Sequence, residues 1–370
     1  MNWTKHSILR HLAKIFSKHS MVLFVVAMGT ILLFVSIPFD NPWVELFYSQ
    51  GLFRAFRIIW DYTLGWSPIP LIYLLITAII VWSYRRLKYP DTSRKWPFRV
   101  LNGVVTLTSL GILLFYWTWG FNYKRPALFD TLKVPKYEPN EEVLFNELER
   151  VTAHLIDLRD QLGERQLKVE DFKITESDLR LSLRRVYRLL ELNFDGRPRI
   201  RKLYPKGSLL HISTAGVYLP FVGEGHIDPG LHPLTWPFTS IHEMAHVQGQ
   251  TGEDVCNFLA LLACVNDKNP AVQYSGWFSY WRYLRANAYR ANSSRYESYW
   301  AQVDGRLKQD LKDVVDYANR YPDILPKLRD LFYDNYLKSH GISEGLQSYS
   351  RIIVLSHSWQ EHFGSLKDFE

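Results

Sequence analysis

Residues 242–246 read His-Glu-Met-Ala-His, and this pentapeptide decides how the rest of the chain is interpreted. On a helix, His242 and His246 stand one turn apart on the same face, so both imidazoles can reach one cation. Glu243 lies beside them, placed to accept a proton from a water molecule that the cation activates. The chain has only 12 histidines among 370 residues, so this spacing rarely arises by chance. The pentapeptide therefore predicts a helix that carries a metal site.

The residues after the pentapeptide offer a third ligand. A catalytic site of this kind takes three protein ligands and leaves one position to water or substrate. Gly249 and Gly252 can end the first helix and reverse the chain. A second, apolar helix would then begin at Glu253 and aim that carboxylate at the histidines. Asn257 lies one turn further on, where a hydrogen bond can orient the ligand, and Asp254 is the alternative ligand.

An ordinary structural role stays open for each of these side chains. His242 and His246 could be buried, hydrogen-bonded histidines, and Glu253 could be a first-turn carboxylate that the helix dipole favours. Separate substitution of Glu253 and Asp254 distinguishes the two ligand assignments.

The amino-terminal third is predicted to be a membrane anchor. Aromatic residues make up 15% of the chain, with 13 Trp, and such side chains favour membrane interfaces. Segment 43–60 is aromatic but contains Glu45, Arg54 and Arg57, so we expect it to lie along the outer interface rather than to cross. Three stretches without charged residues suit a helical span, at residues 21–37, 69–84 and 100–119. The alternative for these three stretches is a buried helical hairpin of a soluble protein.

Basic residues orient this anchor. Residues 1–20 carry four Lys or Arg and no acid, the connection 85–99 carries six, and the connection 38–68 carries two. By the positive-inside rule, the amino terminus and residues 85–99 are cytoplasmic, and everything after about residue 121 is extracytoplasmic. The first span lacks a small-residue processing site, so we interpret it as a retained signal anchor.

The rest of the chain is predicted to be mostly helical with one small sheet. The best strand region is 208–228, where an exposed edge would let an extended peptide pair by main-chain hydrogen bonds; a structural hairpin is an equal alternative. The arginine-rich stretch 180–206 suits either anionic headgroups or a solvated face, and its extracytoplasmic position disfavours nucleic acid. Apolar spacing predicts helices over residues 139–163, 175–192, 274–295, 304–321, 325–340 and 346–360.

Several segments together resemble an uncharacterised bacterial family of zincin-like membrane proteins, domain-of-unknown-function family 3810. The similar segments are Trp-Thr-Trp-Gly-Phe-Asn-Tyr at 117–123, Gly-Val-Tyr-Leu-Pro-Phe-Val-Gly-Glu at 216–224, and residues 242–258, 274–277 and 336–349. The family usually has a second acid where this chain has Val255 in Val-Cys-Asn. The spacing from Glu253 to Asn257 resembles gluzincins, whereas Gly252 stands where metzincins place their third ligand. The resemblance implies an anchor in the bacterial cytoplasmic membrane.

The expected architecture is an α-helical membrane protein, with three transmembrane helices in residues 1–121 and a mostly helical α+β zincin-like domain in residues 122–370. The expected function is a zinc metallopeptidase, with Zn²⁺ bound by His242, His246 and Glu253 and with Glu243 as general base. Its expected partners are the bilayer and a peptide or protein substrate, and the oligomeric state is left open.

Two other functions share these residues. A zinc-dependent hydrolase of envelope lipid or cell-wall amides would use the same water chemistry, and a non-catalytic scaffold would use the metal only to stabilise its fold. An oxyanion donor or substrate contact is also required by the hydrolytic functions. Five side chains are candidates by chemical type: Glu224, Tyr274, Tyr336, His340 and Tyr349.

Overall fold

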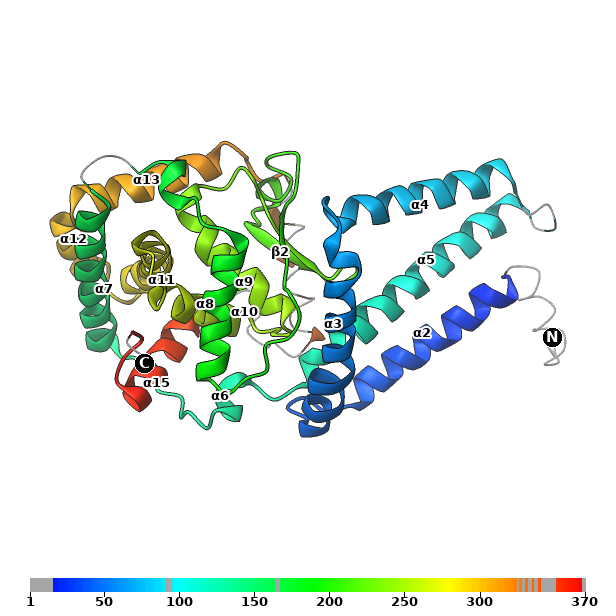
Figure 1. Ribbon diagram of the computed structural model, residues 1–370, viewed down its shortest axis with the longest axis horizontal. Helices are drawn as coiled ribbons and strands as arrows, with labels where there is room; N and C mark the ends of the chain where they lie inside the picture. The colour runs from blue at the N-terminus through cyan, green and yellow to red at the C-terminus, as the bar shows by residue number, and fades with distance from the viewer. Residues whose placement is uncertain are drawn as a thin grey trace. The chain divides into compact units, whose positions relative to one another are not determined.

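The described part of the chain is mostly helical, as the sequence predicts. The computed structural model describes residues 16–90, 93, 95–163, 167–324 and 351–367, together with residues 326, 327, 330, 331, 335, 339 and 340. Within them it forms thirteen α-helices and one three-stranded sheet (Figure 1). The chain divides into two compact units, which we call the apolar-helix unit and the larger unit. The apolar-helix unit holds residues up to 56, 66–125 and 220–223, and the larger unit holds 57–65, 126–219 and 224 onward.

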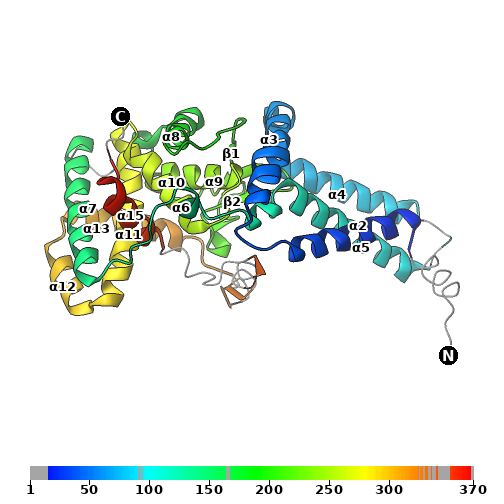
Figure 2. The same cartoon turned by 90° about the horizontal axis from the view of Figure 1, so that it is seen from below.

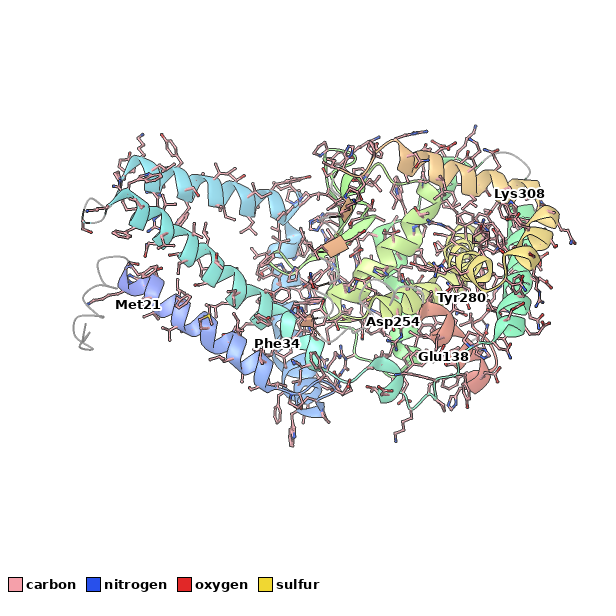
Figure 3. All side chains as sticks on the ribbon, turned by 180° about the vertical axis from the view of Figure 1, so that it is seen from behind. Met21, Phe34, Glu138, Asp254, Tyr280 and Lys308 are labelled. Carbon is pink, nitrogen blue, oxygen red and sulfur yellow. The ribbon has the colours of Figure 1, made fainter. Side chains whose placement is uncertain are left out.

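The apolar-helix unit contains two or three helices that suit a membrane. Helices α2 (Lys18–Ser36) and α5 (Trp96–Thr118) are each long and apolar enough to cross, and α2 packs on α5 through Phe34 and Tyr116, whose ring centroids are 4.7 Å apart. Figure 3 labels Met21 and Phe34 near the two ends of α2. Helix α4 (Leu71–Lys88) passes the same test only together with the segment before it, from which it is bent by 82°.

The aromatic segment predicted at 43–60 is helical throughout. A π-helix spans Val44–Leu52 and continues directly into α3 (Phe53–Tyr62). A break at residues 67–70 then separates it from α4.

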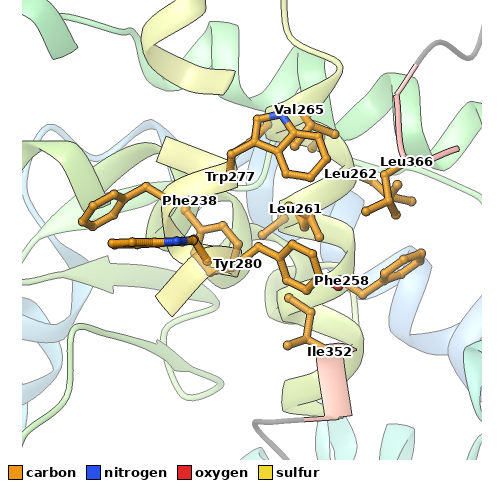
Figure 4. Packing of buried hydrophobic residues seen from close by; sticks show 14 of the residues in the cluster. Phe238, Phe258, Leu261, Leu262, Val265, Trp277, Tyr280, Ile352 and Leu366 are labelled. Carbon is orange, nitrogen blue, oxygen red and sulfur yellow. The ribbon is translucent and has the colours of Figure 1, made fainter. Parts of the chain in front are cut away.

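A single hydrophobic core fills the larger unit, and α10 (Glu253–Val265) runs through it. Every residue of α10 except Val255 is buried. Phe258, Leu261 and Leu262 belong to the same cluster as Trp277 and Tyr280 of α11 (Figure 4). Burying each such side chain stabilises the fold by about 2 kcal/mol. Helix α10 packs on α8 (Glu176–Leu189), α9 (Trp236–Val247), α11 (Pro270–Ala291) and α15 (Ile352–Phe363). The larger unit also contains α6 (Leu128–Thr131), α7 (Glu141–Leu162), α12 (Ser293–Gln302) and α13 (Gly305–Asn319).

Side-chain caps explain where these helices begin. Asn140 accepts the Val143 N–H at 2.9 Å, so the predicted helix 139–163 is α7, and Thr175 caps α8 in the same way. The prediction of one helix over 274–295 is wrong at Asn292, which has an extended backbone and caps α12 by accepting the Arg295 N–H at 3.0 Å. The predicted helix 304–321 is α13. Most of the predicted helix 325–340 lies outside the described residues, as do residues 346–350 of the last predicted helix. The described part of that last helix is α15, which spans Ile352–Phe363.

The sheet has the strand order β1-β3-β2. Strand β1 (Ile200–Lys202) is parallel to β3 (Glu224–Ile227), and β2 (Gly216–Leu219) is antiparallel to β3. The prediction of strand from residue 208 is wrong for its first part, where Leu210–Ile212 forms a 3-10 turn. The reason is Asp228, whose carboxylate accepts backbone N–H groups from Gly207, Leu209, Leu210 and Gly230 and so curls this loop around itself.

Candidate metal centre

A tight turn joins the two helices that carry the candidate ligands. Helix α9 ends at Val247, and Gly249 adopts a left-handed backbone with φ of 86°. The N–H of Gln250 then donates to the carbonyl of Ala245 at 3.1 Å, which closes the helix end. Gly252 has an ordinary φ of −76° and caps α10. Figures 1 and 2 both show α9 and α10 side by side, so this turn sets Glu253 opposite the histidine face.

Three buried side chains converge from these helices. The Nε2 atoms of His242 and His246 are 3.1 Å apart. The Glu253 Oε2 atom lies 3.1 Å from the first and 3.5 Å from the second. Within the described residues this is the one group of three His, Cys, Asp or Glu side chains able to hold a metal ion. Two imidazoles and one carboxylate that point at a common centre form the donor set of a divalent cation.

A backbone carbonyl orients His246 for this task. The ring Nδ1 of His246 lies 2.8 Å from the carbonyl oxygen of Gln250, which can only accept a hydrogen bond, so Nδ1 carries the proton and donates it. In the neutral form of the ring, which is the form that binds metal, the lone pair of Nε2 would face His242 and Glu253. Cys256 lies on the same side, with Sγ 3.3 Å from Nδ1, and burial raises the pKa of its thiol to about 11.

Opposite charges stabilise the ligand group when no cation is bound. Burial alone would lower the pKa of His246, but Cys256 and Glu253 raise it well above its ordinary value. Burial alone would likewise raise the pKa of Glu253, but His246 and His242 lower it well below its ordinary value. Glu253 is therefore an ionised carboxylate at neutral pH, which is the form that binds metal.

Two glycines of the sheet allow it to approach Glu243 of α9 closely. A methyl group built on Gly216 of β2 would come within 2.6 Å of Glu243 Oε1, and one on Gly225 of β3 within 3.0 Å of Glu243 Cβ. Glycine is therefore required at both positions for the strands to approach this carboxylate. Burial raises the pKa of Glu243 to about 7, and Glu253 adds to this while the two histidines oppose it. Its Oε2 has no hydrogen-bond partner among the described residues.

The other residues predicted beside Glu253 have different surroundings. Asn257 is buried one turn along α10. Burial raises the pKa of Tyr283 to about 12, while Arg282 and Asn257 lower it and Glu253 raises it further. Asp254 is turned toward Arg351, with 3.5 Å between Oδ2 and Nε, and is not in the three-residue group (Figure 3 labels it on α10).

Of the candidate oxyanion donors and substrate contacts, three lie in the described part of the chain and contact other groups. The Tyr274 hydroxyl donates to Asp310 at 2.6 Å, and Arg159 donates to the same carboxylate at 3.0 Å, which makes a buried structural network. Glu224 accepts from Arg201 at 3.2 Å. His340 Nδ1 lies 3.1 Å from the Ser339 hydroxyl. Tyr336 and Tyr349 lie outside the described residues.

Sequence reasoning missed two tyrosines that interact electrostatically with this group. Tyr218 is two residues after Gly216 on β2 and therefore on the same face of the sheet. Burial raises its pKa to about 12, while Arg57 and, to a smaller extent, His246 lower it. Tyr283 stands on α11. Period-two alternation from Gly216 was the one available signal for Tyr218, whereas nothing local in the sequence pairs Tyr283 with Asn257.

Fold and site together define a helical protein with candidate membrane helices and a buried His-His-Glu group that could bind a metal ion. The chain belongs to the family described as Protein of unknown function (DUF3810), whose model matches residues 48–356. No curated protein and no solved structure matches the chain.

Proposed function

We propose that this chain is a membrane-anchored, gluzincin-like zinc metallopeptidase. The observation that carries the proposal is the convergence of His242 Nε2, His246 Nε2 and Glu253 Oε2 beside a fourth buried side chain, Glu243, which is not one of the three. Structural zinc sites are usually closed by four protein ligands, whereas catalytic ones have three. A three-ligand group with an adjacent carboxylate supports hydrolysis over a purely structural metal.

The donor set fits zinc, because imidazole nitrogen and carboxylate oxygen are both common zinc ligands. When bound, zinc would lower the pKa of a water molecule and polarise the scissile carbonyl. Glu243 would accept the proton of that water on a carboxylate oxygen and deliver it to the leaving amine. Burial raises its pKa, which favours this exchange, since a base that titrates nearer the working pH can both take and return a proton.

The other residues would position these groups. The Gln250 carbonyl would hold His246 in the correct tautomer, and Asn257 would restrain Glu253. Tyr218 is our candidate for the donor to the developing oxyanion, because it shares a sheet face with Gly216, which touches Glu243. The bond from Tyr274 to Asp310 supports a structural role for that tyrosine instead.

We also propose the organisation inferred from the basic residues. Residues 1–121 would form an anchor with α2, α4 and α5 as three spans, and residues 122–370 would form the hydrolytic domain outside the cytoplasm. The segment 57–65, which belongs to the larger unit, would join the hydrolytic domain.

The test is Glu243→Gln in the purified full chain. We expect peptide hydrolysis to fall by roughly 10² to 10⁴-fold, the usual contribution of a general base, while bound zinc stays at the wild-type level. Glu149→Gln is the matched control, since Glu149 is exposed on α7 and should change neither quantity. Hydrolysis near the wild-type rate by Glu243→Gln with zinc bound would rule out this mechanism.

A further inference from the structure

Residues 57–65 of the larger unit have their polar side buried and their apolar side exposed. We call them the docking segment. An amphipathic helix on a soluble protein has the opposite arrangement, because its apolar face packs on the core. Here Arg57 and Asp61 are 1% and 4% exposed. The apolar side chains stand outward instead, with exposures of 37% for Ile58, 64% for Ile59, 54% for Tyr62 and 47% for Leu64.

Polar bonds hold the docking segment on the larger unit. Arg57 and Asp61 form an ion pair one turn apart on α3. Asp61 also accepts the backbone N–H of Arg197 at 2.8 Å. Arg201 of β1 donates to the Gly65 carbonyl at 3.5 Å and to Glu224 of β3 at 3.2 Å. The docking segment is therefore bonded to the sheet that packs against Glu243.

Only one strand position separates this attachment from the candidate general base. Glu224, which Arg201 contacts, is followed by Gly225, and Gly225 lies against Glu243. The place where the docking segment is attached is therefore close to the candidate metal centre, within the same unit.

Chain connectivity indicates what covers the apolar face. Helix α2 ends at Ser36 and α4 begins at Leu71. If both cross the bilayer, the residues between them begin and end at the same membrane surface, which is the nearest apolar phase available to the docking segment. Two apolar side chains shortly before the docking segment are also exposed, Trp43 at 66% and Phe47 at 65%. Trp and Tyr are the side chains that favour the headgroup region.

We propose that the docking segment lies in the headgroup region of the bilayer and holds the metal site at the membrane surface. Its partner is therefore a lipid surface. The substrate class that follows, which rests on the proposed function, is a peptide segment presented at or beside the membrane rather than a freely diffusing peptide.

A spin label tests the docking without any assay of activity. Ile59→Cys is labelled in the full chain, with one chain per nanodisc of phosphatidylethanolamine and phosphatidylglycerol. The native Cys256 and Cys264 are fully buried, so the introduced thiol reacts selectively. The matched control is Val315→Cys, an exposed apolar position on α13 of the same unit. We expect the ratio of oxygen to nickel-chelate accessibility to be about tenfold higher at position 59, because a charged chelate is excluded from lipid.

Equal ratios at the two positions would overturn the proposal. So would protection at position 59 that appears only when two chains share a nanodisc, because the apolar face would then be covered by a second copy.

A second measurement concerns the substrate. Ile59→Glu should slow cleavage of a lipid-anchored peptide about tenfold, the effect of roughly 1.4 kcal/mol, and leave cleavage of the same peptide in solution unchanged. Equal loss on both peptides would refute the substrate class, and no cleavage by the wild type would refute only the proposed function.

Discussion

Gly216→Ala tests the packing of Glu243 against the sheet. The added methyl would lie 2.6 Å from Glu243 Oε1, 2.8 Å from its Cγ and 2.9 Å from the His226 carbonyl, all closer than an ordinary contact of 3.4 Å or more. Because the His226 carbonyl is part of the backbone and does not move easily, the Glu243 carboxylate must move instead, by roughly 1 Å. A displacement of that size reduces the rate on the order of 10²-fold. Overpacking should also lower the free energy of unfolding by about 1–3 kcal/mol.

The assay combines three readings on the purified full chain: peptide hydrolysis, bound zinc and thermal melting. We expect Gly216→Ala to lose hydrolysis and some stability while it keeps its zinc, because none of the three ligands is touched. Gly305→Ala is the control, since nothing lies within 4 Å of the methyl it would add. If Gly216→Ala hydrolyses peptides as fast as Gly305→Ala, Glu243 is not positioned by β2 and the reasoning fails.

Three further predictions concern stability. Burial lowers the pKa of His232 to about 4, so its contribution is complete above pH 6.5 and is lost as the pH falls toward 4; His232→Asn should flatten this acid-side decline of about 3 kcal/mol in urea titrations at several pH values. Tyr274→Phe should cost about 1–2 kcal/mol in the same titrations and leave bound zinc unchanged, because it breaks only the bond to Asp310. Chelation should lower the melting temperature, and zinc at a hundred times its Kd should restore about 2.7 kcal/mol; an unchanged melting curve would contradict a ligand role for these buried groups.

The sequence predicted the candidate centre better than the rest of the fold, for a physical reason. His242, Glu243, His246 and Glu253 are close in sequence, and one glycine turn at Gly249 is enough to bring them together. Local spacing therefore carries most of the geometry.

Features that depend on distant segments could not be predicted in this way. The approach of Gly216 to Glu243 joins positions 27 residues apart, and Tyr274 reaches Asp310 across 36 residues. Strand β1 has only three residues and is recognisable only by its pairing with β3. The boundary at Asn292 is different, because the signal for it is local. An asparagine before Ser-Ser is typical of a helix start, and Asn292 caps the start of α12, but the apolar spacing predicted one continuous helix there.

The most direct test of the metal centre is the zinc content of the purified full chain, measured by elemental mass spectrometry for the wild type, Glu253→Ala and Asp254→Ala. The geometry predicts one zinc per chain in the wild type and in Asp254→Ala, and almost none in Glu253→Ala, because only the Glu253 carboxylate faces both imidazoles. Full zinc in Glu253→Ala, with zinc lost from Asp254→Ala, would contradict it.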